Sequence, residues 1–283
     1  MRAFFPSTSV LLAAAAFAAA FTLVSCGPAG DQAPQPGTSA FAWAQAKNYF
    51  QKSNFVEASN QLDRLTGKDG EFRDRAEALQ TVIALGLARG EMEWADLLDE
   101  GAIPARTKAL EFRRAASAAR SAAHQMVMRA AEIEHKSLDR LLKSELQLPF
   151  ALPALSADLP VEAARVKKGV VLQQSEQDVA RQRMEQRGVL QAFGIFTGSG
   201  ADVAKTTSAL AAGDFKMKPA TYAAGVAREF VELTAVYAPK KLDNSGQVKL
   251  LCDMAAKALE AAPADEKKAL TKRIDEIRKK LKK

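Results

Sequence analysis

Alanine and other short apolar side chains recur at helical spacing along most of this 283-residue chain. Hydrophobic residues make up 48% of the sequence, whereas aromatic residues make up only 7%. Alanine has the highest helix propensity of the amino acids, and runs of β-branched residues alternating with polar ones are nearly absent. The pattern therefore predicts an all-α chain without a sheet, in which helices pack closely through small side chains.

The first 26 residues have a layout of their own. Arg2 supplies a positive charge, the stretch from Val10 to Phe21 is almost wholly apolar, and Leu-Val-Ser-Cys26 ends the run. This is the layout of a secretory signal peptide, and its apolar run is short for a membrane span, which takes about 20 apolar residues. The last four residues resemble the bacterial lipobox. An ordinary signal peptide or an uncleaved N-terminal membrane anchor stays the alternative.

The lipobox resemblance implies a lipoprotein in which residues 1–25 are removed and Cys26 carries lipid such as palmitate. Gly27, rather than Asp, follows the cysteine, and among Gram-negative lipoproteins this usually accompanies export to the outer membrane. The resemblance thus implies a protein held at the outer membrane and facing the periplasm. Residues 26–40 contain Pro and Gly but little that could be buried, so we expect them to form a flexible tether.

Residues 41–65 resemble a tetratricopeptide repeat, because small and aromatic residues fall at its signature positions, namely Ala46, Tyr49, Phe55, Ala58 and Leu62. Ser53 occupies the turn position of this pattern. A weaker copy follows 37 residues later, in which Gly90 corresponds to Ser53 and Ala95 to Ala58, and it predicts a second helix–turn–helix. The resemblance implies helical-repeat hairpins whose surface binds a protein or peptide partner. Plain helical hairpins stay the alternative.

Helical patterns continue from Pro104 to about Gln147 and from Val161 to Phe193, and then over about 201–212, 219–237, 245–261 and 265–282. Prolines interrupt the chain between residues 149 and 160. We therefore expect a helical-repeat domain over residues 41–148 and a C-terminal helical domain, a bundle, over residues 161–283.

Residue types that carry catalysis or bind metals form no recognisable constellation. His124 and His135 are 11 residues apart, which separates them by about 16 Å along one helix. The Glu-x-x-His spacing at Glu132–His135 lacks the second such motif that a di-iron site requires. Gly198–Gly200 is not followed by the Gly-Lys pair of a phosphate loop. We expect no enzymatic activity, no metal and no cofactor, and we expect Cys252 to be a buried, inert side chain.

The segment 267–283 holds nine Lys or Arg against two acids, so its charge of +7 equals that of the whole chain. An apolar seam at 4-3-4 spacing runs along it, formed by Leu270, Ile274, Ile277 and Leu281. The basic face is either solvated or contacts an anionic partner such as lipid headgroups or cell-wall polymers. The residues expected to make that contact are Lys272, Arg273, Lys279 and Lys280. Nucleic acid does not fit the expected compartment.

These features together predict a membrane-anchored lipoprotein that acts as a non-catalytic protein-binding scaffold in the bacterial cell envelope. The alternative is a lipid-anchored cell-wall enzyme or solute-binding protein with its site in the C-terminal half. A deep pocket lined by converging acidic groups would favour the alternative. A shallow groove over residues 45–100 would favour the scaffold.

Overall fold

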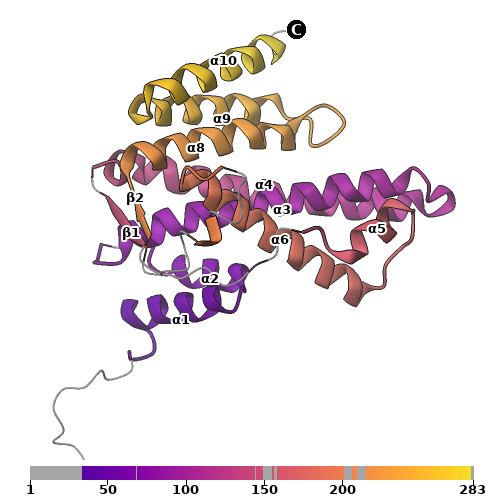
Figure 1. Cartoon of the computed structure of the whole chain (residues 1–283), viewed down its shortest axis with the longest axis horizontal. Coiled ribbons are helices and arrows are strands. Elements are labelled where there is room, and N and C mark those ends of the chain that lie inside the picture. Colours follow the sequence, from indigo (N-terminus) through magenta and orange to yellow (C-terminus); the bar gives the residue numbers. More distant parts are fainter. Residues whose placement is uncertain are drawn as a thin grey trace, which may run out of the picture.

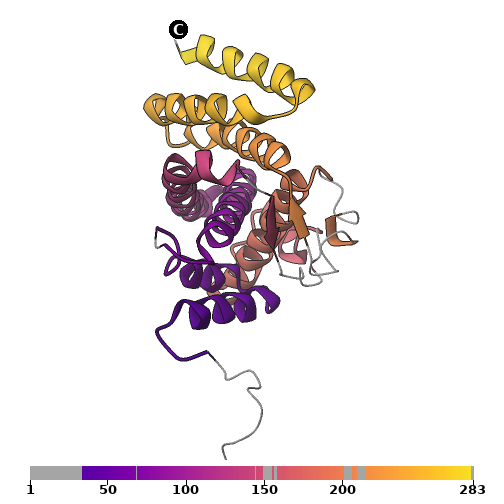
Figure 2. The same ribbon diagram turned by 90° about the vertical axis from the view of Figure 1, so that its left-hand side faces the viewer.

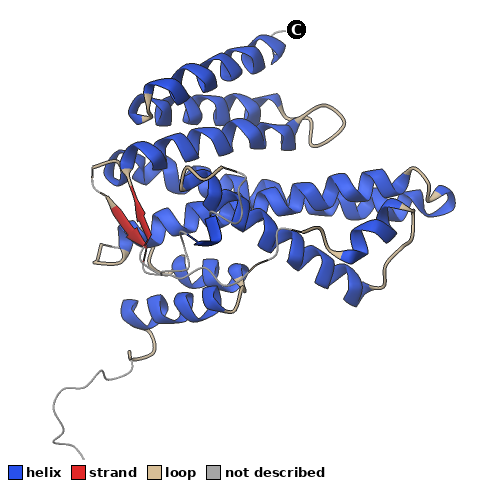
Figure 3. Cartoon of the chain, viewed as in Figure 1, coloured by secondary structure: helices blue, strands red, loops and turns tan. Residues whose placement is uncertain are grey.

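A computed structural model describes residues 34–67, 69–143, 145–148, 155, 158–200, 206–208 and 215–281. Helices dominate these residues, and their only strands are two segments of three residues each (Figure 3). The all-α class predicted from the alanine-rich pattern is confirmed. The expected signal peptide, Cys26 and most of the helix expected over 201–212 lie outside the described residues.

The elements follow one another in the order α1 (Ser39–Gln51), α2 (Phe55–Leu62), α3 (Arg73–Ala102), η1 (Arg106–Lys108), α4 (Ala109–Leu141), β1 (Leu146–Leu148), α5 (Val161–Lys167), α6 (Gln174–Phe196), β2 (Phe215–Met217), α8 (Pro219–Leu233), η2 (Thr234–Tyr237), α9 (Ser245–Ala258), η3 (Leu259–Ala261) and α10 (Ala264–Leu281). They stack in layers, with α1 and α2 at one end and α8, α9 and α10 at the other (Figures 1 and 2). The long helices α3 and α4 lie side by side in the middle of the stack.

The α1–α2 hairpin forms where the sequence resembles a tetratricopeptide repeat. Ser53 turns the chain with a left-handed φ of 58°, and the side chain of Asn54 caps α2 by accepting from the backbone N–H of Glu57 at 3.2 Å. Most of the residues at signature positions are buried in the hairpin, namely Ala46, Phe55, Ala58 and Leu62. Tyr49 is only half-buried, and the neighbouring Phe50 takes the fully buried place, where it contacts the rings of Phe55 and Phe193.

The expected second helix–turn–helix is not formed, because α3 runs unbroken through Gly86 and Gly90. These two glycines lie one turn apart on the face that meets α6. A Cβ built on Gly90 would lie 2.4 Å from the carbonyl oxygen of Met184, which leaves room for no side chain. Glycine at these positions therefore allows a close helix crossing and does not form a turn. Ala95, five residues further along α3, is buried.

Two hydrophobic cores are present, and both draw on residues from either side of the expected domain boundary. The main core extends from Ala42 to Ile274 and joins the whole stack. The second core lies in what we call the distal arm, which comprises residues 94–119 and 160–184 and projects sideways from the stack (Figure 1). Residues on either side of the stretch 149–160 therefore pack together in both cores.

Two further expectations differ from the structure. The helix expected from Val161 to Phe193 is broken into α5 and α6, because Gly169 adopts a left-handed φ of 78° and Val170–Gln173 are not helical. A small antiparallel sheet is present, in which Leu146 of β1 is paired with Met217 of β2 and both residues are buried. Strands of three residues are too short to produce a recognisable alternation. Of the described helices, none combines the length and the apolar character needed to span a bilayer.

Candidate functional site

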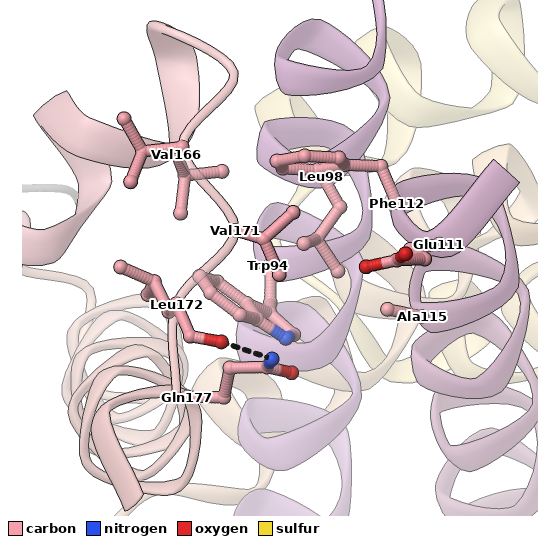
Figure 4. Close-up of a pocket in the computed structure, with 10 residues that line it drawn as sticks. Trp94, Leu98, Glu111, Phe112, Ala115, Val166, Val171, Leu172 and Gln177 are labelled. Carbon is pink, nitrogen blue, oxygen red and sulfur yellow. Dashed lines mark hydrogen bonds between the residues drawn. The ribbon is translucent and has the colours of Figure 1, made fainter. Parts of the chain in front are cut away.

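The distal arm contains a hollow of about 80 Å³ between three segments of the chain (Figure 4). Its walls come from the last turns of α3, the first turns of α4 and the stretch from α5 into α6. The lining residues are Trp94, Leu98, Glu111, Phe112, Ala115, Val166, Val170, Val171, Leu172 and Gln177. We call this hollow the arm pocket.

Helical spacing explains why apolar groups converge here. Trp94 and Leu98 are one turn apart on α3, so both face the same way. Phe112 approaches from α4, and a Cβ built on Gly101 would lie 2.8 Å from its ring, which shows how closely the two helices meet. Trp94, Leu98 and Phe112 are nearly completely buried and form the floor.

The rim is formed by the loop between α5 and α6. Val170 and Val171 are 40% and 39% exposed, whereas the next residue, Leu172, is buried. The side-chain amide of Gln177 donates a hydrogen bond of 2.8 Å to the carbonyl oxygen of Leu172 and holds the loop in place (Figure 4). The arm pocket thus has a fixed apolar floor and a partly exposed aliphatic rim.

Only one carboxylate lines the arm pocket. Glu111 is half exposed and pairs with Lys108 at 2.6 Å. The pocket is therefore not the deep site with converging acidic groups that would favour an enzyme. At about 80 Å³ it is also smaller than the ~300–1,000 Å³ of a typical small-molecule site, so its size suits one apolar side chain.

The most strongly perturbed acids are enclosed within the helical stack instead. Glu134 of α4 is 1% exposed and accepts hydrogen bonds from the hydroxyls of Thr81, at 2.8 Å, and Tyr222. Burial raises the pKa of Glu134 to about 7, although these two hydrogen bonds oppose the rise. The sequence analysis did not single out Glu134, yet it falls in the buried i, i+4 row between Ala130 and Leu138.

Two other acids with raised pKa values lie near an arginine, Glu229 near Arg89 of the neighbouring α3 and Glu185 near Arg181 of its own helix α6. Burial raises the pKa of Glu229 to about 7. The positive charge of Arg89, whose guanidinium lies 2.9 Å from the Glu229 carboxylate, opposes this rise. The pKa of Glu185 is raised to about 8, mainly by burial and to a smaller extent by a hydrogen bond with Glu91. Glu91 itself is nearly completely buried and pairs with Arg181. The pairs Arg89–Glu229 and Arg181–Glu91 tie α3 to α8 and to α6.

The histidines lie apart, as their spacing requires. His135 and Glu132 are exposed, and Glu132 pairs with Lys136 at 2.6 Å. His124 forms a hydrogen bond of 2.8 Å between its Nδ1 and the hydroxyl of Tyr237. Within the described parts of the chain, no three His, Cys, Asp or Glu side chains are grouped to hold a metal ion.

Cys252 is fully buried, and burial raises the pKa of its thiol.

The basic face of α10 is exposed at the end of the stack. Leu270 and Ile274 of the expected seam are buried against the neighbouring helices, Ile277 is half-buried, and Leu281 is 37% exposed. The basic residues expected to meet an anionic partner are exposed, namely Lys272, Arg273, Lys279 and Lys280. Arg273 approaches Glu232 at 3.9 Å.

A larger polar hollow of about 270 Å³ lies where the end of α2 meets α3 and α4. Its charged side chains pair with one another, as Arg129 does with Asp63, Arg73 with Glu77 at 3.3 Å, and Lys136 with Glu132. Such pairs leave few unmatched charges for a ligand. α3 is buried along most of its length, so few of its side chains are open to a partner.

Comparison with known proteins finds no match for this chain among protein-family models, curated proteins or solved structures. The arm pocket therefore has to be interpreted from its own chemistry. The sequence analysis missed this pocket because its lining comes from three segments far apart in the chain. The one local signal was the apolar triplet Val170–Leu172, which follows Lys167, Lys168 and Gly169 between two helices.

Proposed function

We propose that this protein is a lipid-anchored, non-catalytic protein-binding scaffold of the bacterial cell envelope, and that its docking site is the arm pocket. The arm pocket is the single observation that carries the proposal. It offers a preformed apolar floor beneath a partly exposed rim, and partner proteins commonly anchor a side chain in a pocket of this kind. The site on residues 45–100 that the repeat resemblance implied is replaced by this one.

Membrane attachment rests on the Leu-Val-Ser-Cys26 layout. A lipid anchor would concentrate the scaffold at one surface, while the tether would let the stack stand away from it. The twelve residues between Cys26 and α1 would reach at most about 40 Å if fully extended. Of the tether expected over residues 26–40, the structure describes residues 34–40. All of these are exposed, and the last two, Ser39 and Ala40, already form the start of α1.

Membrane attachment is tested by the substitution Cys26→Ala, with Cys252→Ala as the matched control. We expect Cys26→Ala to release the protein from membranes or to leave an unprocessed precursor, and we expect a fatty-acid probe to label only the chain that retains Cys26. Labelling of the Cys26→Ala chain would contradict the proposal.

Docking is tested by placing a photo-reactive amino acid at Val171 and, as a control, at the exposed Lys249 of α9. In native cells, position 171 should give a cross-link to one partner protein, and position 249 should not. Filling the arm pocket with Ala115→Phe should abolish that cross-link, while Ala269→Phe on the exposed side of α10 should leave it intact. The same adduct from both positions would argue against a docking site in the arm.

A further inference from the structure

The end of the distal arm presents aliphatic side chains to solvent. Ile103 and Leu110, on either side of the turn between α3 and α4, are 83% and 58% exposed. The loop that carries Val170 and Val171 packs against this turn, since a Cβ built on Gly169 would lie 2.8 Å from the backbone nitrogen of Ala105. The turn that carries Ile103 and Leu110 therefore lies against the rim loop of the arm pocket, and we call the surface formed by these two segments the arm tip.

The arm tip is also strongly basic. Residues 103–114 and 165–172 contain seven Lys or Arg and a single acid, Glu111. Three of the cations pair with carboxylates, namely Lys108 with Glu111, Arg165 with Glu176 and Lys167 with Glu100. The other four are exposed and form no ion pair with any residue that the structure describes: Arg106, Arg113, Arg114 and Lys168.

We propose that the arm tip binds an acidic polypeptide segment, in which one apolar side chain enters the arm pocket and flanking Asp or Glu residues meet the free cations Arg106, Arg114 and Lys168. This inference rests on the proposed function and specifies the chemistry of the partner. The apolar anchor supplies buried area, and the charges supply orientation and a faster encounter. Opposite charges around an apolar anchor also discriminate against neutral or basic segments.

An anionic bilayer is the other occupant that a basic, aliphatic surface could meet. The shape of the site favours the polypeptide. The floor residues Trp94, Leu98 and Phe112 are recessed and nearly completely buried beneath the rim, so the arm pocket is a hollow between helices rather than a protruding wedge. A single side chain can fill such a hollow, whereas a bilayer surface would contact only the rim.

The test is selection of random 12-residue peptides displayed on phage, with the lipid-anchored chain from Cys26 onward held in nanodiscs of zwitterionic phosphatidylcholine as the target. We expect the enriched peptides to share one large apolar residue with Asp or Glu on both sides. A synthetic copy of the most enriched peptide should bind less tightly as salt rises, because the charges are exposed.

Two sets of variants locate the binding. The triple substitution Arg106→Glu, Arg114→Glu and Lys168→Glu should lower the affinity for the peptide by about tenfold or more. Each change replaces attraction of an acidic side chain with repulsion. The matched control makes the same change of charge on α10, through Lys267→Glu, Lys268→Glu and Lys272→Glu, and should have little effect. Ala115→Phe should abolish binding.

Enrichment of neutral or basic peptides would contradict the inference that the partner segment is acidic, but it would leave the arm pocket as a docking site. Absence of any enriched peptide would overturn this inference, whereas the cross-link from Val171 separately decides the proposed function. A third outcome would also overturn the inference. If no peptide is enriched, but the protein binds phosphatidylglycerol nanodiscs and the triple variant does not, the occupant of the arm tip is an anionic bilayer.

Discussion

Gly188 of α6 meets Gly86 of α3 so closely that a Cβ built on Gly188 would lie 2.2 Å from the carbonyl oxygen of Gly86. The same Cβ would lie 2.5 Å from the backbone nitrogen of Gly90. Three glycines on two helices therefore set the distance between α3 and α6. This crossing joins the stack to the distal arm, because α6 begins in the arm core and ends in the main core.

The substitution Gly188→Ala tests this contact. The added methyl group must push two backbones apart, and we expect a loss of about 3 kcal/mol or more in the free energy of unfolding, since packed helices do not separate without losing other contacts. Chemical denaturation followed by circular dichroism measures the change. Gly70→Ala is the control, because a Cβ there meets nothing within 4 Å. Equal stability of the two variants would show that the crossing is looser than described.

Ala58 in α2 offers a second packing test, since it is fully buried in the α1–α2 hairpin. Ala58→Leu should overpack the hairpin and cost about 1–3 kcal/mol. In a protein of this size that corresponds to a fall in Tm of ~2–4 °C per kcal/mol. Ala40→Leu, at an exposed position of α1, should leave Tm nearly unchanged. An unchanged Tm for Ala58→Leu would remove the support for a packed hairpin here.

The contrast between Ser53 and Gly90 explains what the sequence could and could not predict about the fold. Both residues occupy the turn position of the repeat pattern, yet only Ser53 has a left-handed φ, whereas Gly90 lies within α3. Glycine permits a turn and equally permits a close helix crossing, and local sequence does not distinguish these uses. The helices over 219–237, 245–261 and 265–282 were predictable, because each has its own helical spacing of apolar residues.

The arm pocket could not be predicted for a different reason. Trp94, Phe112 and Leu172 each look like ordinary core residues within their own segments, and only the folded chain brings them around one hollow. Buried acids such as Glu134 raise a similar difficulty, since a carboxylate in an apolar helical row is usually expected at the surface. Its partners, Thr81 and Tyr222, come from helices distant in sequence.

Glu134 should make stability depend on pH. Its pKa rises from an ordinary 4.5 to about 7 in the folded protein, so the folded state holds the proton more tightly than the unfolded state. The contribution to stability is complete below about pH 4.5 and is lost as the pH rises through about 7. The difference between the folded-state and ordinary pKa values corresponds to roughly 3 kcal/mol in the free energy of unfolding.

Glu134→Gln keeps an acceptor oxygen for Thr81 and Tyr222 but cannot ionise. We therefore expect the variant to lose less stability than the parent protein between pH 5 and pH 8, by about 1–3 kcal/mol. Urea unfolding across this range measures the difference. Glu260→Gln, at an exposed acid, should leave the pH profile unchanged. Parallel profiles for parent and Glu134→Gln would show that Glu134 does not ionise in this window.

The last prediction concerns α10, whose two faces have separate roles. Leu270 and Ile274 are buried and fix the helix on the stack, while Lys272, Lys279 and Lys280 are exposed. Replacing these three lysines by Glu should therefore leave Tm nearly unchanged. If an anionic envelope component binds this face, its binding must be electrostatic, and it should weaken as the Debye length falls from ~10 Å at 0.1 M salt to ~3 Å at 1 M.

The measurement is sedimentation of residues 27–283 with anionic vesicles and with purified cell wall, at low and at high salt. We expect the parent protein to sediment with one of them at low salt only, and the Lys272→Glu, Lys279→Glu, Lys280→Glu variant to stay in solution. The control places the same three charge changes at the exposed Lys47, Lys52 and Lys143, away from α10. If the parent protein binds neither material at low salt, the basic face is only the solvated side of a terminal helix, and its charge serves solubility rather than recognition.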